Sequence, residues 1–297
     1  MKRLLIANRG EIAIRIARSA ADLGLPSVAL FSEDDAASLH VQAADAAQPL
    51  PGTGPAAYLD IGQVIAAARA AGCDAVHPGY GFLSENAAFA RACAEAGLRF
   101  VGPDPDTLDA FGDKARARAL AHRCGVPVMD GTSHATSLAE AEAFFAALGP
   151  GAGMMVKAIA GGGGRGMRVV TRADEVAPAW ERCRAEALQA FGLVDVYVER
   201  LFPRARHVEV QVIGDGRGGV MHLWERECSL QRQRQKLIEI APAPNLDPAL
   251  RQQLLDASLA MAAAVNYRSL GTFEFLVNAD VGAGGPAFAF IEANARL

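Results

Sequence analysis

The chain has 297 residues, is 51% hydrophobic and 21% charged, and carries a formal net charge of −4. This composition excludes a disordered chain, and no basic excess favours nucleic acid or an anionic membrane surface as a partner. The apolar stretches are far shorter than the roughly 18 residues of a membrane-spanning helix. Five widely spaced cysteines without a Cys-x-x-Cys pair predict reduced thiols and a cytoplasmic protein.

The N-terminal third alternates short apolar strands with helices. Strands are predicted at 4–7, 27–31, 75–77 and 98–101, and helices at 11–23, 61–71 and 82–96. Such alternation is typical of a parallel sheet, which binds ligands beyond the carboxyl ends of its strands. We therefore expect a Rossmann-like domain over 1–111, with 8–11 and 77–81 at its ligand-binding edge.

The remaining residues, 112–297, are predicted to form an α+β unit. A helix from Thr107 to Cys124 carries Lys114. A smaller unit follows. It has predicted strands at 154–159, 167–171 and 196–200, a helix at 138–148, and a second helix that follows 171 and ends at about 190. The rest is predicted as strands 207–213 and 220–225, a charged loop 226–236, a helix 247–266 and a terminal hairpin, 271–277 with 288–297.

Lysine is scarce in this chain. Of its 29 basic residues, the lysines are Lys2, Lys114, Lys157 and Lys236. An arginine-biased chain keeps lysine mainly where a compact ammonium charge is needed. The last three lysines are therefore candidate functional residues, whereas Lys2 is interpreted as a chance survivor. The segment 226–236 ends at one of them, so it is either a solvated loop or an anion site.

A glycine loop, Ala-Gly-Gly-Gly-Gly-Arg-Gly-Met at 160–167, joins two predicted strands. This position argues against a nicotinamide-dinucleotide fingerprint, which needs a helix that begins within the glycines. A loop without side chains can close over phosphates and offer several backbone N–H donors. We expect Gly163 and Gly164 to cover phosphates, with Lys157 just upstream; a merely tight hairpin is the alternative.

Glu274 and Glu292 are equidistant from residue 283, so a hairpin that turns at 282–285 places them opposite each other. Apolar neighbours predict that these strands are buried, and facing buried carboxylates repel. A divalent cation would remove the repulsion. Oxygen ligands with Asn294 nearby favour Mg²⁺ or Mn²⁺ held with nucleotide phosphates. A solvated hairpin in another register is the alternative.

These features are the parts of an ATP-dependent ligase, and the sequence resembles the biotin carboxylase family of the ATP-grasp fold along its whole length. Besides Lys157 and the glycine loop, the matching segments are IANRGEIA at 6–13, HPGYGFLSEN at 77–86, GDK at 112–114, RHVEVQ at 206–211, ERECS at 225–229, GTFEFL at 271–276 and FIEANAR at 290–296. The HPGYGFLSEN run is highly specific to biotin-dependent carboxylases.

The resemblance implies a ligase that carboxylates carrier-linked biotin with ATP and bicarbonate through carboxyphosphate. This is the first half-reaction of an acyl-CoA carboxylase or a related enzyme. The implied cofactors are ATP and Mg²⁺ or Mn²⁺. The implied partners are a biotin carboxyl carrier protein or domain and a carboxyltransferase, in a homodimer or larger complex. The implied fold is an ATP-grasp domain over 112–297, with a glycine-flap lid at about 130–203.

The resemblance also assigns roles to individual residues. ATP would be contacted by Lys114, Lys157, Gly163, Gly164, Glu199, Arg200, Leu201, His207, Gln231, Arg234 and Leu276. The metal would be held by Glu274, Glu292 and Asn294. Lys236 and Arg296 would bind bicarbonate as the catalytic residues, and Tyr80 would border the biotin pocket.

The chain departs from the family pattern in two places. Gln233 and Arg234 stand where the family has Arg and His, and that His normally helps to hold the nucleotide. The chain stops at Leu297, before the Gln-Val-Glu-His segment with the general base and before a C-terminal subdomain. We therefore expect an incomplete ATP-grasp domain with little activity by itself. Another ATP-grasp ligase, or a non-catalytic nucleotide-binding or assembly module, are the alternatives.

Overall fold

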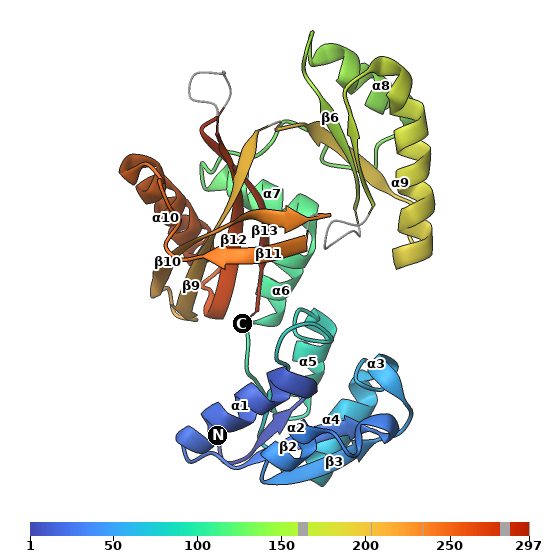
Figure 1. Ribbon diagram of the computed structural model, residues 1–297. Helices are drawn as coiled ribbons and strands as arrows, with labels where there is room; N and C mark the ends of the chain where they lie inside the picture. The colour runs from blue at the N-terminus through green and yellow to red at the C-terminus, as the bar shows by residue number, and fades with distance from the viewer. Residues whose placement is uncertain (160–165, 203, 234, 280–285, 297) are drawn as a thin grey trace.

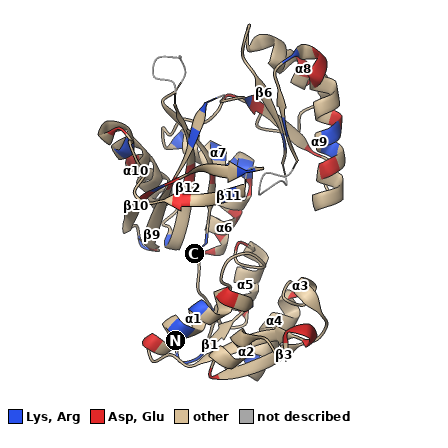
Figure 2. Cartoon of the chain, in the orientation of Figure 1, with Lys and Arg blue, Asp and Glu red and all other residues tan. Residues whose placement is uncertain are grey.

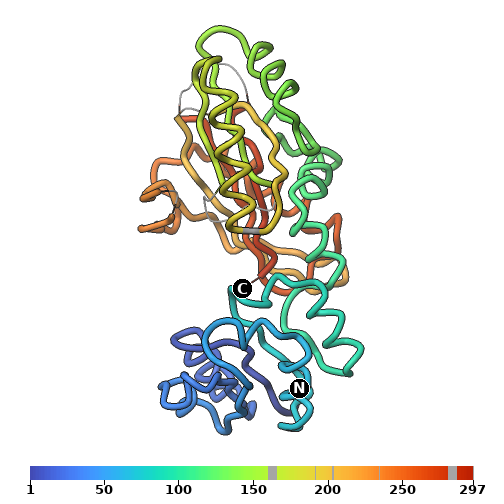
Figure 3. Tube along the Cα trace, turned by 90° about the vertical axis from the view of Figure 1, so that its right-hand side faces the viewer, coloured from blue at the N-terminus to red at the C-terminus, as the bar shows by residue number. Residues whose placement is uncertain are grey.

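The computed structural model describes residues 1–159, 166–202, 204–233, 235–279 and 286–296. Within these residues the strands form an N-terminal five-stranded sheet, a central five-stranded sheet and a three-stranded sheet (Figure 1). The predicted class, α/β followed by α+β, is confirmed. The three units follow one another along the molecule, with the three-stranded sheet farthest from the N-terminal one (Figure 3).

The N-terminal sheet is parallel, with strand order β3-β2-β1-β4-β5. Its strands are β1 (Leu4–Ile6), β2 (Ser27–Ser32), β3 (Ala46–Leu50), β4 (Ala75–His77) and β5 (Arg99–Phe100). Its helices are α1 (Gly10–Asp22), α2 (Leu39–Ala43), α3 (Gly54–Ala57), α4 (Ile61–Ala70) and α5 (Ala87–Glu95). The strand order reverses between β1 and β4, and ligands of such sheets bind beyond the carboxyl ends of the strands at this point.

Two details of this unit differ from the prediction. Strand β3 was not predicted; it contains Pro49, which is tolerated because β3 is an edge strand. The helix expected over 82–96 begins only at Ala87. Phe82 has a φ of +43°, outside the helical region, and the Asn86 side chain accepts the N–H of Phe89 as the helix cap.

The helix expected from Thr107 to Cys124 is in fact two helices, α6 (Pro105–Gly112) and α7 (Lys114–Arg123). The break occurs because the Asp113 carboxylate accepts the backbone N–H groups of Ala115 and Arg116 and so caps a new helix. Lys114 is consequently the first residue of α7 instead of a mid-helix residue. Its side chain is half-buried at the start of that helix.

The central sheet is antiparallel, with strand order β11-β10-β9-β12-β13. Its strands are β9 (Ala205–Asp215), β10 (Val220–Arg232), β11 (Gln235–Ile240), β12 (Arg268–Asn278) and β13 (Phe288–Asn294). Helix α10 (Pro248–Ala263) packs on β9 and β10, and α6 and α7 pack on β13. An aromatic cluster forms the core beneath the sheet: Phe111, Tyr267, Phe273, Phe275, Phe288 and Phe290.

The segment 226–236, expected as a charged loop, is mostly a hairpin made by the end of β10 and the start of β11. Its charges are paired across strands, as Arg226 shows with Glu239, and so they do not prevent strand formation. The hairpin crosses in front of β12 and β13 (Figure 1). This crossing brings β11 close to β12, from which β10 and β9 separate it in the sheet order.

The three-stranded sheet has the order β7-β6-β8 and is antiparallel. It contains β6 (Met154–Ala158), β7 (Met167–Val170) and β8 (Val196–Arg200), covered by α8 (Leu138–Ala147) and α9 (Val176–Phe191). Its buried residues form a core of their own, around Met154, Val156 and Cys183. Among the helices that the structure describes, none is long and apolar enough to cross a membrane.

Gly214 of β9 lies against the backbone of Tyr267, and an added Cβ would overlap the Tyr267 carbonyl oxygen. We expect Gly214→Ala to lower the free energy of unfolding by about 2 kcal/mol or more, because neither backbone can move without breaking the β9–β12 ladder. Gly112→Ala is the matched control, since its Cβ would meet nothing within 4 Å. Urea denaturation measures both; equal stabilities would contradict this packing.

Candidate active site

Three carboxylates lie side by side across the central sheet. Glu274 of β12 is the register partner of Glu209 on β9 and of Glu292 on β13. The predicted opposition of Glu274 and Glu292 is therefore confirmed, whereas the predicted turn at 282–285 lies outside the described residues. Glu209 and Glu274 are 1% and 3% exposed, so this row of acids requires nearby positive charge.

Lys236 supplies much of that charge from β11. Its Nζ lies 2.8 Å from Glu274 Oε1 and 2.5 Å from Glu209 Oε2, so one ammonium group bridges two buried acids. Arg226 of β10 forms a second ion pair with Glu209. Figure 2 shows acidic and basic residues interleaved on the strands around β12. The crossing hairpin thus holds the carboxylate row together.

The other contacts of Glu274 come from His207 and Asn294. His207 Nε2 lies 2.6 Å from Glu274 Oε2, and Asn294 Nδ2 lies 2.5 Å from Oε1. Gln231 donates from Nε2 to the Cys228 carbonyl and lies 2.8 Å from His207 Nδ1. Because an amide nitrogen only donates, His207 Nδ1 is the acceptor in this contact. The proton of His207 is therefore on Nε2, which donates a hydrogen bond to Glu274.

The two facing acids have opposite pKa shifts. Burial raises the pKa of Glu274, but the hydrogen bond from His207 and the charge of Lys236 outweigh it and lower that pKa to about 2. Burial and the charge of Glu274 raise the pKa of Glu292, although three nearby lysines oppose them, Lys114, Lys157 and Lys236. Glu292 is therefore the acid in the row that lacks sufficient compensating charge.

A second group lies where α7 meets the three-stranded sheet. Lys157 of β6 forms an ion pair with the buried Glu199 of β8, and Arg118 Nη1 lies 3.7 Å from the same carboxylate. Burial lowers the pKa of Lys114, against the charge of Glu292. Arg118 was not predicted, although it lies four residues after Lys114 and hence on the same helix face.

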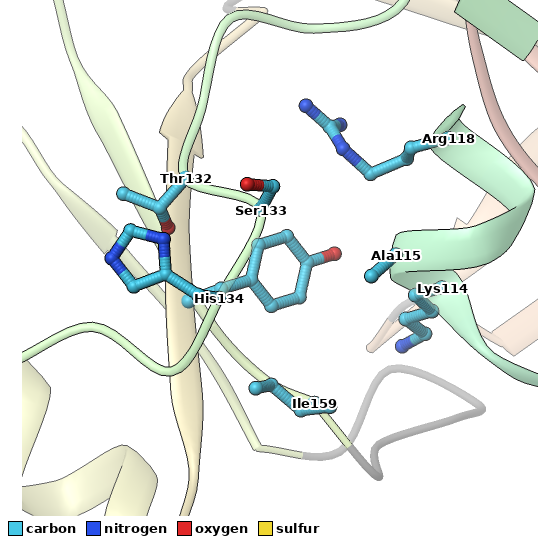
Figure 4. A pocket seen from close by; sticks show the side chains of 8 residues that line it. Lys114, Ala115, Arg118, Thr132, Ser133, His134 and Ile159 are labelled. Atoms are coloured by element: carbon cyan, nitrogen blue, oxygen red, sulfur yellow. The ribbon is translucent and has the colours of Figure 1, made fainter.

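This second group borders a pocket (Figure 4). Lys114, Ala115 and Arg118 line one side, and Thr132, Ser133, His134 and Ile159 line the other, together with Tyr197. The two residues that follow Glu199 are held by the loop before α8 and by the turn before β6. Arg200 Nε lies 3.3 Å from Asp130 Oδ2, and the Leu201 N–H donates to Gly153 O.

A third group lies between the N-terminal and central sheets. Arg296 Nε is 2.5 Å from Glu85 Oε1, and the Tyr80 hydroxyl donates to Glu11. The hydrogen bond to Glu11 raises the pKa of Tyr80, and the nearby charge of Arg296 lowers it in part. Tyr80 and Arg296 therefore lie near each other beyond the carboxyl end of β4, whereas Lys236, the other predicted bicarbonate residue, lies at the carboxylate row.

The structure brings most of the predicted residues together. Leu276 is the register partner of His207, beside the carboxylate row. Gly163, Gly164 and Arg234 lie outside the described residues. Glu209 was not predicted, although His207 and Glu209 alternate in a strand and must therefore share a face. That alternation was the signal that could have identified it.

The donor set fits a divalent cation. Two facing carboxylates with an adjacent amide are hard oxygen ligands of the kind that Mg²⁺ and Mn²⁺ prefer, and the raised pKa of Glu292 marks a deficit of positive charge beside it. A second set shares Glu274. It consists of His207, Glu209 and Glu274, which each offer one ligand atom, and these three atoms lie within 4.8 Å of one another.

Two family models match the chain. The N-terminal domain of biotin carboxylase matches residues 1–108, and the ATP-binding domain of the carbamoyl-phosphate synthase L chain matches residues 113–297. The chain therefore belongs to the biotin carboxylase family, whose catalytic core is an ATP-grasp domain.

Individual relatives agree with this assignment. Pyruvate carboxylase of Staphylococcus aureus is 47% identical over 300 residues, which cover 100% of this chain and 25% of the relative. Biotin carboxylase of Campylobacter jejuni, solved as a β,γ-ATP complex, has a TM-score of 0.94 at 41% identity. The match covers 100% of this chain and 65% of the solved chain. The chain thus spans a quarter of the length of the curated relatives that it matches.

A third relative was solved with ligands. It is the biotin carboxylase domain of 2-oxoglutarate carboxylase from Hydrogenobacter thermophilus, in complex with MgADP, ADP and bicarbonate. Its TM-score is 0.93 at 39% identity, over 100% of this chain and 64% of the solved one.

The opposite pKa shifts of the facing acids predict opposite effects of removing their charges. Glu292→Gln should leave the stability of the metal-free protein unchanged or raise it, because it relieves repulsion from Glu274. Glu274→Gln should lower that stability by roughly 2–3 kcal/mol, since it weakens bonds to Lys236 and His207. Urea denaturation with a chelator present measures both.

The pH dependence follows from the sign of the Glu292 shift. A carboxyl with a raised folded-state pKa binds its proton more tightly when folded, so it destabilises the fold increasingly as pH rises through that pKa. The stability gain of Glu292→Gln should therefore be largest near pH 8 and vanish below about pH 4, where the unfolded carboxyl is also protonated. A gain that grows toward acid pH would contradict this.

Proposed function

We propose that this chain takes part in the ATP- and bicarbonate-dependent carboxylation of carrier-linked biotin, the first half-reaction of a biotin-dependent carboxylase, with little activity by itself. The observation that carries the proposal is the position of Lys236, which bridges Glu209 and Glu274 beside Glu292. This places one ammonium group next to a metal-type acid pair. Family membership and the bicarbonate in the Hydrogenobacter relative point to the same chemistry.

ATP is proposed to lie between the central and three-stranded sheets. Lys114 and Lys157 would neutralise its phosphates, and Gly163 and Gly164 would cover them. Glu199, Arg200 and Leu201 would frame the adenine. The remaining proposed contacts are His207, Gln231, Arg234 and Leu276. Lys114 and Lys157 both lie close enough to Glu292 to lower its pKa, and this supports the arrangement. Phosphates would balance the two lysine charges, and the metal would balance the charge of Glu292.

Glu274, Glu292 and Asn294 would hold the Mg²⁺ or Mn²⁺ that accompanies ATP. When bound, the metal would neutralise charge on the phosphate oxygens during transfer. The residues of the chain supply positioning and charge. Lys236 and Arg296 would hold bicarbonate so that its oxygen attacks the γ-phosphorus, which gives carboxyphosphate and ADP. Carboxyphosphate then yields CO₂ and phosphate, and the N1′ atom of biotin, bordered by Tyr80, attacks the CO₂ and releases its proton to phosphate.

The wider assignments rest on the family. We propose an N-terminal domain over 1–111 and an ATP-grasp domain over 112–297, with a lid at about 130–203. The proposed partners are a biotin carboxyl carrier and a carboxyltransferase, because the relatives include multidomain carboxylases. The cytoplasm is the proposed location, supported by five free cysteines, four of them buried.

The role of Lys236 can be tested by an exchange that keeps the charge. Lys236→Arg in the complete natural protein should lower bicarbonate-dependent ATP cleavage about 100-fold, because the longer, planar guanidinium would hold its charge and donors in a different place from the compact ammonium. ATP affinity should change less than about 3-fold. Lys2→Arg, the same exchange at an exposed position, is the control. Full activity of Lys236→Arg would contradict the role, and ATP cleavage that never responds to bicarbonate would contradict the function.

A further inference from the structure

The ion pair between Glu85 and Arg296 joins the N-terminal sheet to the end of β13, and its role rests on the function proposed above. Glu85 belongs to the loop 78–86, which connects β4 to α5 and carries Tyr80. Arg296 follows Asn294 closely in the chain. The pair therefore connects the proposed biotin edge of one sheet with the proposed metal and bicarbonate end of the other.

The first half of this loop is fixed by Asn8, which is 0% exposed. The Asn8 Nδ2 donates to the carbonyls of Pro78, at 2.7 Å, and of Tyr80, at 3.0 Å, and its Oδ1 accepts the Arg9 N–H. A Cβ on Gly79 would come within 2.6 Å of Asn8 Nδ2, so the loop packs directly on this amide. Both hydrogen bonds of the buried Nδ2 thus hold the loop, while Oδ1 is satisfied by the Arg9 N–H.

The second half of the loop is equally constrained. Leu83 and Ser84 are 3% and 2% exposed, and Asn86 caps α5 by accepting the Phe89 N–H at 2.9 Å. Glu85 lies between a buried residue and a capping residue, so its backbone has little freedom. Its side chain is 42% exposed and extends to Arg296. Because its backbone is fixed, the Glu85 carboxylate can hold the Arg296 side chain in one orientation.

The Arg296 end of the pair is also anchored in its backbone. Ala295 is buried, and the Arg296 N–H donates to the Asn294 carbonyl at 2.9 Å. The long arginine side chain nevertheless has several rotatable bonds, which the backbone does not fix. Contact between Glu85 and Nε selects a direction for the guanidinium, toward the edge where Tyr80 lies.

We propose that Glu85 is a positioning residue, which orients the Arg296 guanidinium so that bicarbonate on the central sheet faces biotin at the N-terminal sheet. The pair is too exposed, at 30% and 42%, to contribute much to folding stability. Its consequence is instead geometric. The contact holds the charge of Arg296 between the N-terminal and central sheets. Glu85 would act through Arg296 and would not itself contact bicarbonate or biotin.

The test compares Glu85→Gln with Asp109→Asn in the complete natural protein. Asp109 forms an ion pair of similar exposure with Arg91, so its variant controls for loss of a surface ion pair. Glu85→Gln should raise the KM for bicarbonate about 10-fold and change the KM for ATP less than 2-fold. Asp109→Asn should change neither. Glu85→Asp, which keeps the charge on a shorter side chain, should lie between Glu85→Gln and the unaltered protein.

A second readout does not need activity. In the ¹⁵N-labelled 297-residue chain, the Arg296 Nε–H signal should shift and exchange faster with water in Glu85→Gln, and stay in place in Asp109→Asn. An unmoved signal, or a bicarbonate KM equal to that of the unaltered protein, would overturn the proposal. Equal losses for ATP and bicarbonate would also overturn it, since they indicate general damage. Absence of bicarbonate-dependent cleavage in the unaltered protein would contradict the proposed function, while the Nε–H signal would still decide the positioning role.

Discussion

Repulsion among three neighbouring carboxylates, two of them buried and one half-buried, is the constraint on which the rest of the site depends. Glu209, Glu274 and Glu292 are consecutive cross-strand neighbours, so their charges cannot separate without breaking the sheet. Lys236 and Arg226 compensate Glu209, and Lys236 and His207 compensate Glu274. Glu292 is left with a raised pKa and with three lysines in its surroundings. A metal with nucleotide phosphates would complete this balance of charge.

The curvature of the central sheet follows from the same constraint. In strand order, β11 is separated from β12 by β10 and β9, yet Lys236 of β11 contacts Glu274 of β12. This contact requires the β10–β11 hairpin to fold over the sheet, as Figure 1 shows. The irregular register between Glu227 and Gln231 lies within that hairpin. Irregularities of this kind bend a strand, so they allow the crossing that places the ammonium group.

Local patterns in the sequence were sufficient to predict the parallel sheet and the facing positions of Glu274 and Glu292. Counting from residue 283 placed Glu274 opposite Glu292. On the turn side of that pair Phe275 faces Phe290, one residue off the counted register, and the bulge between Glu274 and Phe275 restores the predicted pairing. The hairpin at 226–236 was missed because the partners of its charges are far away in the sequence. Arg226 pairs with Glu239 and Glu209, and no local window contains all three. The helix break at Asp113 depended on a single capping side chain, which periodicity does not reveal.

The most direct test of the central claim is the position of the metal in a crystal of the complete natural protein with Mn²⁺ and a non-hydrolysable ATP analogue. The anomalous signal of manganese locates the ion without assumptions about its ligands. We expect a peak coordinated by Glu274, Glu292 and Asn294, with Lys114 and Lys157 on the phosphates. A peak held instead by His207, Glu209 and Glu274, the other set that shares Glu274, would contradict it.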